Sequence, residues 1–294
     1  MKSNLQMNGN SYCTIAAIIP IYNEEKVIKR TIDSLLHQRF TAVSPCKLYI
    51  FMVDDASSDH TYEIIKKYCD IFGNVYCFRM PFRPRYNITS YAVARILNYI
   101  LKHISILGLK IDYILVIGAD LILSDYYIDK VISSVKQFEA KGEKIAGGCG
   151  VIINEPRARY IPSGAGLIIK YSLLMETGGI KPEPAEDTGI FLRLIDKGWK
   201  LVIVKNAHMY LQRPTGLRES NKRCYFQGIA DAYFCTSTSY FLLKIILKMM
   251  KGKLRCTMNY VKGYLSSLNI KNKRYCRARK IVELLRLKST FSGT

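Results

Sequence analysis

The sequence predicts an α/β fold, with a mostly parallel central sheet flanked by helices and a basic helical region after it. Two observations carry this prediction. Apolar segments of strand length alternate with amphipathic segments over the first two-thirds of the 294 residues, which is the order of a doubly wound sheet. The last third then holds nearly all of the net positive charge. We expect a flexible N-terminus over 1–12, an α/β domain over 13–218 and a basic helical region over 219–294.

Buried strands are expected where short apolar segments are rich in branched residues. These segments are 14–20, 48–53, 75–80 and 113–117. The helices expected between them begin after Asn23, which is a good N-terminal cap, after Asp59 and at Tyr91. Beyond residue 120 the pattern is looser, with a helix at 128–138 and strands at 145–153, 164–169 and 201–204.

Positive charge is concentrated at the C-terminal end of the chain. Residues 1–196 hold 23 Lys or Arg against 20 Asp or Glu, whereas residues 197–294 hold 21 against 3. The first part is therefore nearly neutral and the last part has a net charge of +18. Such an excess implies an anionic partner for the last part.

The nine cysteines are scattered and form no C-x-x-C pair, so zinc-ribbon and thioredoxin-like sites have no support. We expect them to be buried free thiols in a reducing cytosol, and a disulfide-rich intracellular protein of a thermophile is the alternative. No segment reaches the roughly 18 uncharged apolar residues of a membrane-spanning helix. The first ten residues are too polar for a signal peptide. These observations predict a cytoplasmic protein.

Carboxylates follow two of the expected strands. Asp54 and Asp55 end the second strand, and Asp120 follows the strand at 113–117. In a parallel α/β sheet, ligands bind in the crevice at the carboxyl ends of the strands. The two positions therefore predict a site for a metal, a nucleotide, or both.

Four short motifs occur along the chain in an informative order. They are Ile19-Pro20-Ile21-Tyr22-Asn23-Glu24-Glu25, Val53-Asp54-Asp55-Ala56-Ser57-Ser58-Asp59, Gly118-Ala119-Asp120, and Gly178-Gly179-Ile180 followed by Ala185-Glu186-Asp187. In this order and spacing they resemble the family 2 glycosyltransferases, which have the GT-A fold and use nucleotide-activated sugars. The resemblance spans residues 14–215.

The resemblance implies which residues bind the nucleotide. They are Pro20, Tyr22, Glu24, Asp54, Asp55, Asn98 and Asp120. Asp55, with Asp54 beside it, would accept the imide N–H of the base, while the turn at 20–24 lines the base and ribose. Capping of their own turn is the alternative role for the two aspartates, because Asx turns are common. For Asn98, the alternative is an ordinary amide on a helix surface.

Asp120 matches the last Asp of the family's D-x-D motif, which implies that it holds Mn²⁺ or Mg²⁺ against the donor diphosphate. The first Asp of the motif is replaced here by Gly118, so Asp120 would hold the ion together with phosphates and water. Many family members have a metal-binding His at the position of Leu211, and His208 lies three residues before it. We expect His208 to be exposed or packed rather than a ligand.

Asp187 matches the family's catalytic base, which takes the proton of the attacking hydroxyl. Direct displacement by that hydroxyl implies inversion at the anomeric carbon. A carboxylate in the first turn of a helix is also an ordinary cap, which is the alternative for Asp187. Arg213, Arg218 and Arg223 follow the last expected strand and are candidates for gripping a diphosphate or a lipid phosphate.

An amphipathic segment at 240–251 places Lys244, Lys248 and Lys251 on one helical face and apolar residues on the other. This pattern is typical of a helix in a membrane interface, and further basic residues favour an anionic membrane surface over 240–288. The alternative is a helix packed on the catalytic core with its lysines in solvent. Nucleic acid ranks third, because no nucleic-acid motif is present.

We therefore predict an inverting glycosyltransferase, peripheral on the cytoplasmic face of a membrane. It would transfer a single sugar from a nucleotide-diphosphate sugar to a glycan or lipid-linked acceptor, such as a polyprenyl-phosphate-linked glycan. The alternatives are a nucleotidyltransferase and a catalytically weak or inactive family member that binds nucleotide sugar or membrane. Gly118 and Leu211 keep the last alternative open.

Overall fold

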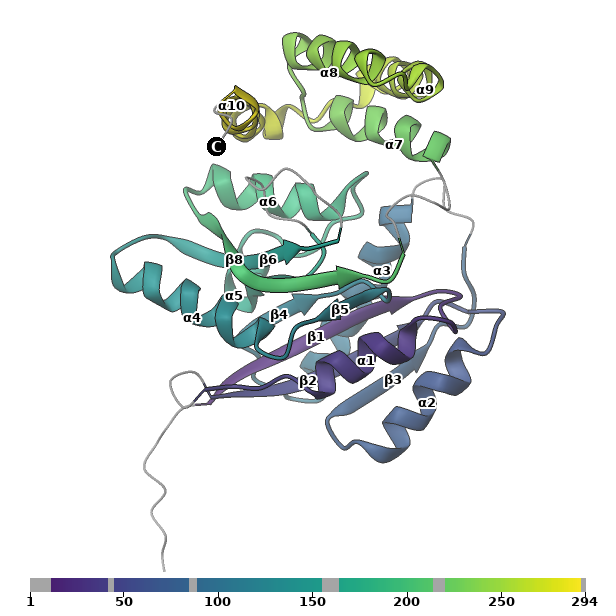
Figure 1. The fold of residues 1–294 in the computed structure, drawn as a ribbon, viewed down its shortest axis with the longest axis vertical. Coiled ribbons are helices and arrows are strands. Elements are labelled where there is room, and N and C mark those ends of the chain that lie inside the picture. The colour runs from purple at the N-terminus through teal and green to yellow at the C-terminus, as the bar shows by residue number, and fades with distance from the viewer. Residues whose placement is uncertain (1–11, 42–44, 85–88, 155–163, 214–219, 292–294) are drawn as a thin grey trace, which may run out of the picture.

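The computed structural model describes residues 12–41, 45–84, 89–154, 164–213 and 220–291. A sheet with helices on both faces forms the larger part, and a layer of C-terminal helices lies beyond α6 (Figure 1). The strands are β1 (Cys13–Ile21), β2 (Cys46–Asp54), β3 (Val75–Arg79), β4 (Tyr113–Val116), β5 (Leu121–Leu123), β6 (Ile145–Ile152), β7 (Leu167–Lys170) and β8 (Lys200–Leu211). The α-helices are α1 (Ile28–Leu36), α2 (Thr61–Ile71), α3 (Thr89–Ile106), α4 (Tyr127–Ala140), α5 (Tyr171–Glu176), α6 (Glu186–Asp196), α7 (Ser220–Tyr233), α8 (Thr238–Met250), α9 (Leu254–Leu265) and α10 (Cys276–Phe291), with short 3₁₀ turns η1 (Leu268–Ile270) and η2 (Lys273–Tyr275). The predicted flexible N-terminus lies outside the described residues, apart from Tyr12.

The eight strands have the order β3-β2-β1-β4-β7-β6-β8-β5. The first four in this order are parallel to one another, whereas β7 runs antiparallel to both β4 and β6. β8 is parallel to β6 and antiparallel to β5. This arrangement confirms the predicted α/β class with a mostly parallel sheet, and it brings the carboxyl ends of β1, β2 and β4 to one edge.

Both faces of the sheet are buried. In β1, Ile15, Ala17 and Ile19 join a core with α1, α2 and α4, whereas Ala16 and Ile18 join a second core with α3, α5 and α6. All five side chains are completely buried. A strand buried on both faces has a continuous apolar sequence, which explains why β1 to β4 lie close to their predicted positions.

The prediction is wrong for β8, which runs for 12 residues rather than over 201–204. Lys205 and Asn206 in its middle are exposed, so they interrupt the apolar pattern on which the prediction rests. Strand β5 was not predicted, because its three residues directly follow Asp120 and are too few to show a period.

Helices α7 and α9 touch backbone to backbone. A Cβ atom added at Gly228 would lie 2.1 Å from the Tyr260 carbonyl oxygen, and one added at Gly263 would lie 2.0 Å from that of Tyr225. Only glycine allows so close an approach. The described part of the predicted basic region 219–294 is therefore helical and tightly packed, while its boundary at residue 219 stays a prediction.

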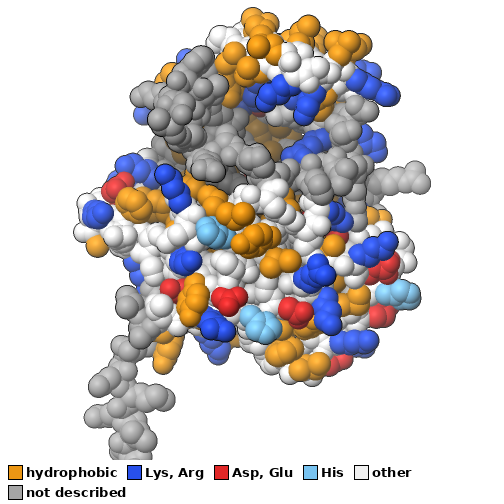
Figure 2. All heavy atoms as spheres, viewed as in Figure 1, with side chains coloured by type: hydrophobic (Ala, Val, Ile, Leu, Met, Phe, Trp, Pro, Cys, Tyr) orange, Lys and Arg blue, Asp and Glu red, His pale blue; other side chains and the backbone are white. Residues whose placement is uncertain are grey.

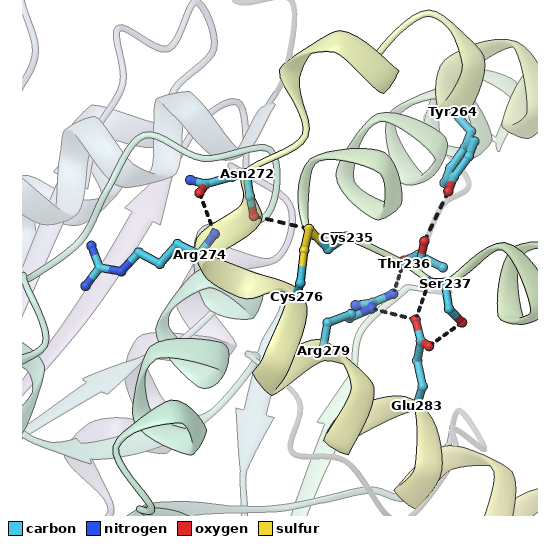
Figure 3. The surroundings of a disulfide bond; sticks show 9 residues. All are labelled: Cys235, Thr236, Ser237, Tyr264, Asn272, Arg274, Cys276, Arg279 and Glu283. Atoms are coloured by element: carbon cyan, nitrogen blue, oxygen red, sulfur yellow. Dashed lines mark hydrogen bonds and ion pairs between the residues drawn. A yellow bond between two sulfur atoms is a disulfide. The ribbon is translucent and has the colours of Figure 1, made fainter.

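Eight of the nine cysteines form disulfides, and Cys149, which is buried, is the cysteine outside these pairs. The pairs are Cys13–Cys46, Cys69–Cys77, Cys224–Cys256 and Cys235–Cys276, the last of which links the end of α7 to α10 (Figure 3). The expectation of free thiols is therefore wrong for these eight. Their Cα atoms lie 4.4 to 6.0 Å apart, within the reach of a disulfide. Folding brings together partners that are 8 to 41 residues apart, so their spacing does not reveal them.

Helix α8 turns two of its lysines toward the protein. Lys244 Nζ lies 2.6 Å from Asp231 of α7, and Lys248 donates to the Gln227 side chain at 3.0 Å. Large apolar residues of α8 are exposed instead, namely Leu242 (52%), Ile246 (54%), Met249 (54%) and Met250 (79%). The alternative of a packed helix with its lysines in solvent is therefore wrong for Lys244 and Lys248. Among the residues that the structure describes, no helix combines the length and hydropathy needed to cross a bilayer.

Candidate active site

The loops that follow β1 and β2 are linked to each other by Asn23. Its backbone N–H donates to Ser57 Oγ at 2.9 Å, and its Oδ1 accepts from the Ser58 N–H at 2.9 Å. Asn23 has a φ of 53°, a left-handed conformation that asparagine tolerates. The prediction that Asn23 caps the next helix is wrong, because α1 begins at Ile28 without a side-chain cap. Asn23 instead holds together two loops that carry predicted nucleotide-binding residues.

Asp55 follows β2 and is completely buried between two arginines. Arg95 Nη2 lies 2.8 Å from Asp55 Oδ1, and Arg83 Nη1 binds Oδ2. Burial raises the pKa of the Asp55 carboxyl, against the opposing effect of the two guanidinium groups. The Arg83 guanidinium also lies 3.8 Å from the centre of the Tyr22 ring. Asp55 and Tyr22, both predicted to bind nucleotide, therefore meet around one arginine.

Asp54 binds its own turn. Its two carboxylate oxygens accept the Ser57 N–H at 3.3 and 3.2 Å, and Arg79 Nε lies 3.3 Å from Oδ2. The side chain is completely buried. These contacts match the turn-capping alternative for Asp54.

Pro20 and Asn98 lie in supporting positions. Pro20 is near the end of β1, where it pairs with Val53 of β2. Asn98 Nδ2 donates to the Ile180 carbonyl oxygen at 2.8 Å, which links α3 to the motif at 178–180. The Asn98 amide thus holds a backbone segment, and its role beside a nucleotide stays a prediction.

Arg213 joins Glu24 and Asp120 into one charged cluster. Its Nε lies 2.9 Å from Asp120 Oδ2, and its Nη2 binds Glu24 Oε1. Burial lowers the pKa of the guanidinium, but the hydrogen bond and charge of Glu24, together with Asp120, raise it overall. The neighbouring Gln212 is fixed by hydrogen bonds to the Val27 carbonyl at 3.0 Å and the Asp120 carbonyl at 2.9 Å. Glu24 and Asp120, two predicted site residues, are therefore brought together by Arg213, which follows the end of β8.

Asp120 offers one carboxylate to a divalent cation. Mg²⁺ is commonly held by one or two carboxylates together with substrate phosphates. The described residues contain no group of three or more His, Cys, Asp or Glu side chains that could hold a metal. A Cβ atom added at Gly118 would lie 3.2 Å from Asp120 Oδ1, so a carboxylate at position 118 would adjoin Asp120. The residues present therefore fit a metal held by Asp120 and diphosphate oxygens, with Arg213 sharing the same carboxylate.

His208 is packed rather than placed at the cluster, as expected. It is partly buried within β8 and pairs with Val151 of β6. Leu211, at the position of the family's histidine, pairs with Leu121 of β5. Among the described residues, no histidine therefore joins Asp120 in a group that could bind a metal.

Glu186 and Asp187 form the first turn of α6. The Thr188 N–H donates to Asp187 Oδ1 at 2.6 Å, and a Cβ atom added at Gly164 would lie 2.3 Å from Asp187 Oδ2. Burial, reinforced by the charge of Asp187, raises the pKa of the Glu186 carboxyl well above its usual range. Adjacent carboxyl groups in different environments can take different protonation states. Glu186 therefore keeps its proton at neutral pH.

Asp187 lies at the same sheet edge as Asp120. Gly164, which contacts the Asp187 carboxylate, leads into Gly166, whose N–H donates to the Val116 carbonyl oxygen at 3.0 Å. Val116 is the last residue of β4, and Asp120 follows it in the next loop. The structure thus brings the candidate base to the edge where the charged cluster lies.

The sequence did not predict a buried ion pair between Arg193 of α6 and Glu183, which lies just before that helix. Arg193 Nη1 lies 2.8 Å from Glu183 Oε2, and its Nη2 donates to the Gly179 carbonyl at 2.8 Å. The Tyr275 hydroxyl donates to the other oxygen of Glu183. These contacts link the candidate active site to the C-terminal helices. The only sequence signal for Glu183 is its place just before the motif at 185–187.

Comparisons with known sequences give one family. The model of Glycosyl transferase family 2 matches residues 16–182, more than half of the chain. The uncharacterized glycosyltransferase MG025 of Mycoplasma genitalium is 29% identical over 144 residues, which make up 49% of this chain and 42% of that protein. The chain therefore spans less than half the length of this curated relative.

Comparisons with solved structures give one fold. Mannosyltransferase PcManGT from Pyrobaculum calidifontis, solved in complex with GDP-Man and Mn²⁺, has a TM-score of 0.57 at 13% identity and covers 97% of this chain and 89% of its own. S. aureus TarS has a TM-score of 0.53 at 13% identity, covering 95% and 55%. A shorter form of TarS in complex with UDP-GlcNAc has a TM-score of 0.51 at the same identity, covering 95% and 91%. The predicted GT-A fold is confirmed, and at this identity the likeness carries no more than the fold.

Proposed function

Because the chain belongs to glycosyl transferase family 2, we propose that it transfers a single sugar, with inversion, from a nucleotide-diphosphate sugar to an acceptor at a membrane surface. The observation that carries this proposal is the meeting of a charged cluster around one arginine and a carboxylate pair at one sheet edge. Arg213 with Glu24 and Asp120 forms the first, and Glu186 with Asp187 forms the second. The complexes of PcManGT with GDP-Man and of TarS with UDP-GlcNAc support a nucleotide sugar as the donor class.

The nucleotide would bind at the ends of β1 and β2. Tyr22 and the Arg83 guanidinium that lies over its ring offer a flat surface for the base. Asp55 is fixed in orientation by Arg83 and Arg95, and each carboxylate oxygen can accept a further hydrogen bond. An imide N–H of the base is the donor that this arrangement suits.

The diphosphate would bind at Arg213. Negative charge develops on the nucleoside diphosphate as its bond to the sugar breaks, and a fixed guanidinium stabilises that charge without reorganisation. Asp120 would hold Mn²⁺ or Mg²⁺ together with the phosphates, and the ion when bound supplies additional Lewis-acid stabilisation of the leaving group. The charged cluster at Arg213 thus serves the departure of the nucleotide.

Asp187 would act as the base. The acceptor hydroxyl attacks the anomeric carbon from the face opposite the diphosphate, the bond to the diphosphate breaks, and Asp187 takes the hydroxyl proton. The Thr188 N–H and Gly164 orient the Asp187 carboxylate. Asp187 is the residue at the position of the family's base, whereas Glu186 beside it has a raised pKa and holds its own proton. A single displacement gives inversion.

The enzyme would act as a peripheral protein on the cytoplasmic face of a membrane. The exposed apolar side chains of α8, together with the +18 charge of residues 197–294, suit an anionic lipid surface. Because Lys244 and Lys248 face the protein, the apolar side of α8 is presented outward. An anionic membrane is the occupant that we propose for this surface.

The test is a turnover assay with the purified chain. A panel of nucleotide sugars is offered with and without Mn²⁺, and release of nucleoside diphosphate and the mass of the product are measured. We expect turnover of one donor, increased by Mn²⁺. Binding of a donor without turnover would instead support the inactive family member. Release of pyrophosphate from a nucleoside triphosphate and a sugar phosphate would support the nucleotidyltransferase.

A further inference from the structure

A cavity of about 860 Å³ lies between the start of α6 and helices α7 to α9. On the α6 side it is lined by Pro184, Ala185 and Thr188, which flank Glu186 and Asp187 in the chain. Its volume falls within the range of small-molecule sites, roughly 300–1,000 Å³. The cavity therefore adjoins the start of α6, the helix whose first turn holds the candidate base.

Positive charge dominates the lining of this cavity. The cationic side chains among its described residues are Arg223, Lys244, Lys248, Lys253, Arg255 and Arg279, and Asp231 is the one acidic side chain among them. Asp231 is already bound by Lys244 and Arg279 at 2.6 Å each. Although burial raises it, these two cations hold the pKa of Asp231 well below its usual range. The single carboxylate is thus committed to two of the six cations.

Lys248 lies near several other cations at the α8–α9 side of the cavity, as well as near Asp231. Lys248 donates to the neutral Gln227 side chain at 3.0 Å. Burial, together with the nearby charges of Lys253 and Arg223, lowers the pKa of the Lys248 ammonium despite Asp231. Lys253 and Arg255 are exposed at the start of α9. Like charges in a partly enclosed space repel one another, so an anionic ligand would stabilise this arrangement.

Apolar side chains surround the outer side of the same cavity. Leu254, which lines it, is 61% exposed, and Met249 and Met250 of the adjoining turn are exposed as well. Figure 2 shows hydrophobic side chains gathered over α8 and α9, with Lys and Arg side chains directly below them. A ligand that carries both an anionic group and an apolar chain would satisfy both surfaces.

We propose that this cavity binds the phosphate group of the sugar acceptor, with an isoprenyl or similar chain of that acceptor lying along the apolar rim. The inference rests on the proposed function, because it assigns the acceptor of the same reaction. Phosphate oxygens accept several charge-assisted hydrogen bonds from Arg and Lys. The acceptor is then a sugar linked through this phosphate to the chain: with the phosphate in the cavity, a free hydroxyl of that sugar lies toward the first turn of α6, where Asp187 takes its proton.

The test compares two double variants that remove the same charge. Lys253→Gln/Arg255→Gln changes two exposed cations of the cavity, and Lys262→Gln/Lys271→Gln changes two exposed lysines elsewhere in the C-terminal helices. Calorimetry measures binding of farnesyl phosphate, farnesol and glucose 1-phosphate to each protein. We expect the cavity variant to lose about tenfold or more in affinity for farnesyl phosphate, while the control variant and nucleoside diphosphate binding are unchanged.

The outcomes separate the parts of the proposal. Equal affinity of the two variants for farnesyl phosphate, or binding of farnesol as tight as that of farnesyl phosphate, would overturn the phosphate site. Glucose 1-phosphate binding as tightly as farnesyl phosphate would keep the phosphate site and overturn the isoprenyl chain. Phosphate binding without turnover of any donor would overturn the proposed function alone. Transfer of the sugar to an acceptor without a phosphate, at the same rate as to the matching acceptor with a phosphate, would overturn this inference alone.

Discussion

The sheet edge proposed to bind the nucleotide-sugar donor, here called the donor end, differs from the cavity above α6 in how its cationic side chains are paired. At the donor end, four arginines meet four carboxylates: Arg79 with Asp54, Arg83 and Arg95 with Asp55, and Arg213 with Glu24 and Asp120. The lining of the cavity holds six described cations and one aspartate, which Lys244 and Arg279 bind. Paired charges hold their positions before any ligand arrives, whereas surplus cations are stabilised when an anion binds. The donor end is therefore preorganised, and the cavity is suited to recognising a charged partner.

Asp187 lies where these two regions meet, and its removal should have the largest effect. Asp187→Asn should lower kcat by about 10²- to 10⁴-fold, the usual contribution of a general base, and leave nucleotide affinity unchanged. Steady-state transfer and calorimetric nucleotide binding measure the two quantities. Glu186→Gln is the matched control, and it should retain most of the activity because Glu186 is already protonated. Full activity of Asp187→Asn would place the base elsewhere.

Removing Arg213 breaks the pairing at the donor end. Arg213→Gln leaves Glu24 and Asp120 without their shared guanidinium, so transfer should slow by about 10²- to 10³-fold, as for loss of a donor that stabilises transition-state charge. Arg39→Gln, which removes an exposed pair with Asp125, should change little. An Arg213→Gln enzyme that is faster than the wild type with Mn²⁺ would mean that the arginine competes with the metal.

The disulfide that links the end of α7 to α10 closes a longer loop than the disulfide between α2 and β3. Cys235→Ser/Cys276→Ser opens a link between residues 41 apart and should lower the free energy of unfolding by about 4 kcal/mol on the chain-entropy estimate. Cys69→Ser/Cys77→Ser, with a separation of 8, should cost about 2.5 kcal/mol on the same estimate. Denaturant unfolding under oxidising conditions measures both. A larger loss for the shorter loop would contradict this account.

The smallest expected effect concerns the pH dependence of stability. Because the pKa of Glu186 is raised on folding, the folded state binds more protons, and the stability that this gives is present at low pH. It is lost as the pH rises from the ordinary value of 4.5 through the raised folded value. Glu186→Gln should therefore gain about 1 kcal/mol or more relative to the wild type between about pH 5 and pH 8. The free energy of unfolding of the wild type and of Glu186→Gln is measured across this pH range, and the same pH dependence for both proteins would contradict this prediction.

The strands of the first half of the fold could be predicted because they are buried on both faces. Their apolar residues run without interruption, and turn residues follow them. β8 could not be predicted in full, because exposed Lys205 and Asn206 interrupt its pattern. The sequence also predicted amphipathic character for α8, but not that Lys244 would turn inward, since the position of Asp231 on α7 decides it.

The carboxylates of the candidate site could be predicted because each follows a strand or begins a helix. Their partners could not, because Arg83, Arg95 and Arg213 reach Asp55, Glu24 and Asp120 only through the folded chain. The same reason hides the disulfides and the cavity. Local sequence patterns predict which helix or strand carries a functional side chain. The partners of that side chain depend on long-range contacts, which form only in the folded chain.

The central claim is that a sugar is transferred with inversion to an acceptor whose phosphate lies in the cavity. The most direct measurement is the anomeric configuration, read by NMR, of the product made by the purified chain from its nucleotide sugar and an isoprenyl-phosphate-linked sugar as acceptor, in the presence of Mn²⁺. We predict a product whose configuration is opposite to that of the donor. A product with retained configuration, or no product from any nucleotide sugar, would contradict the account.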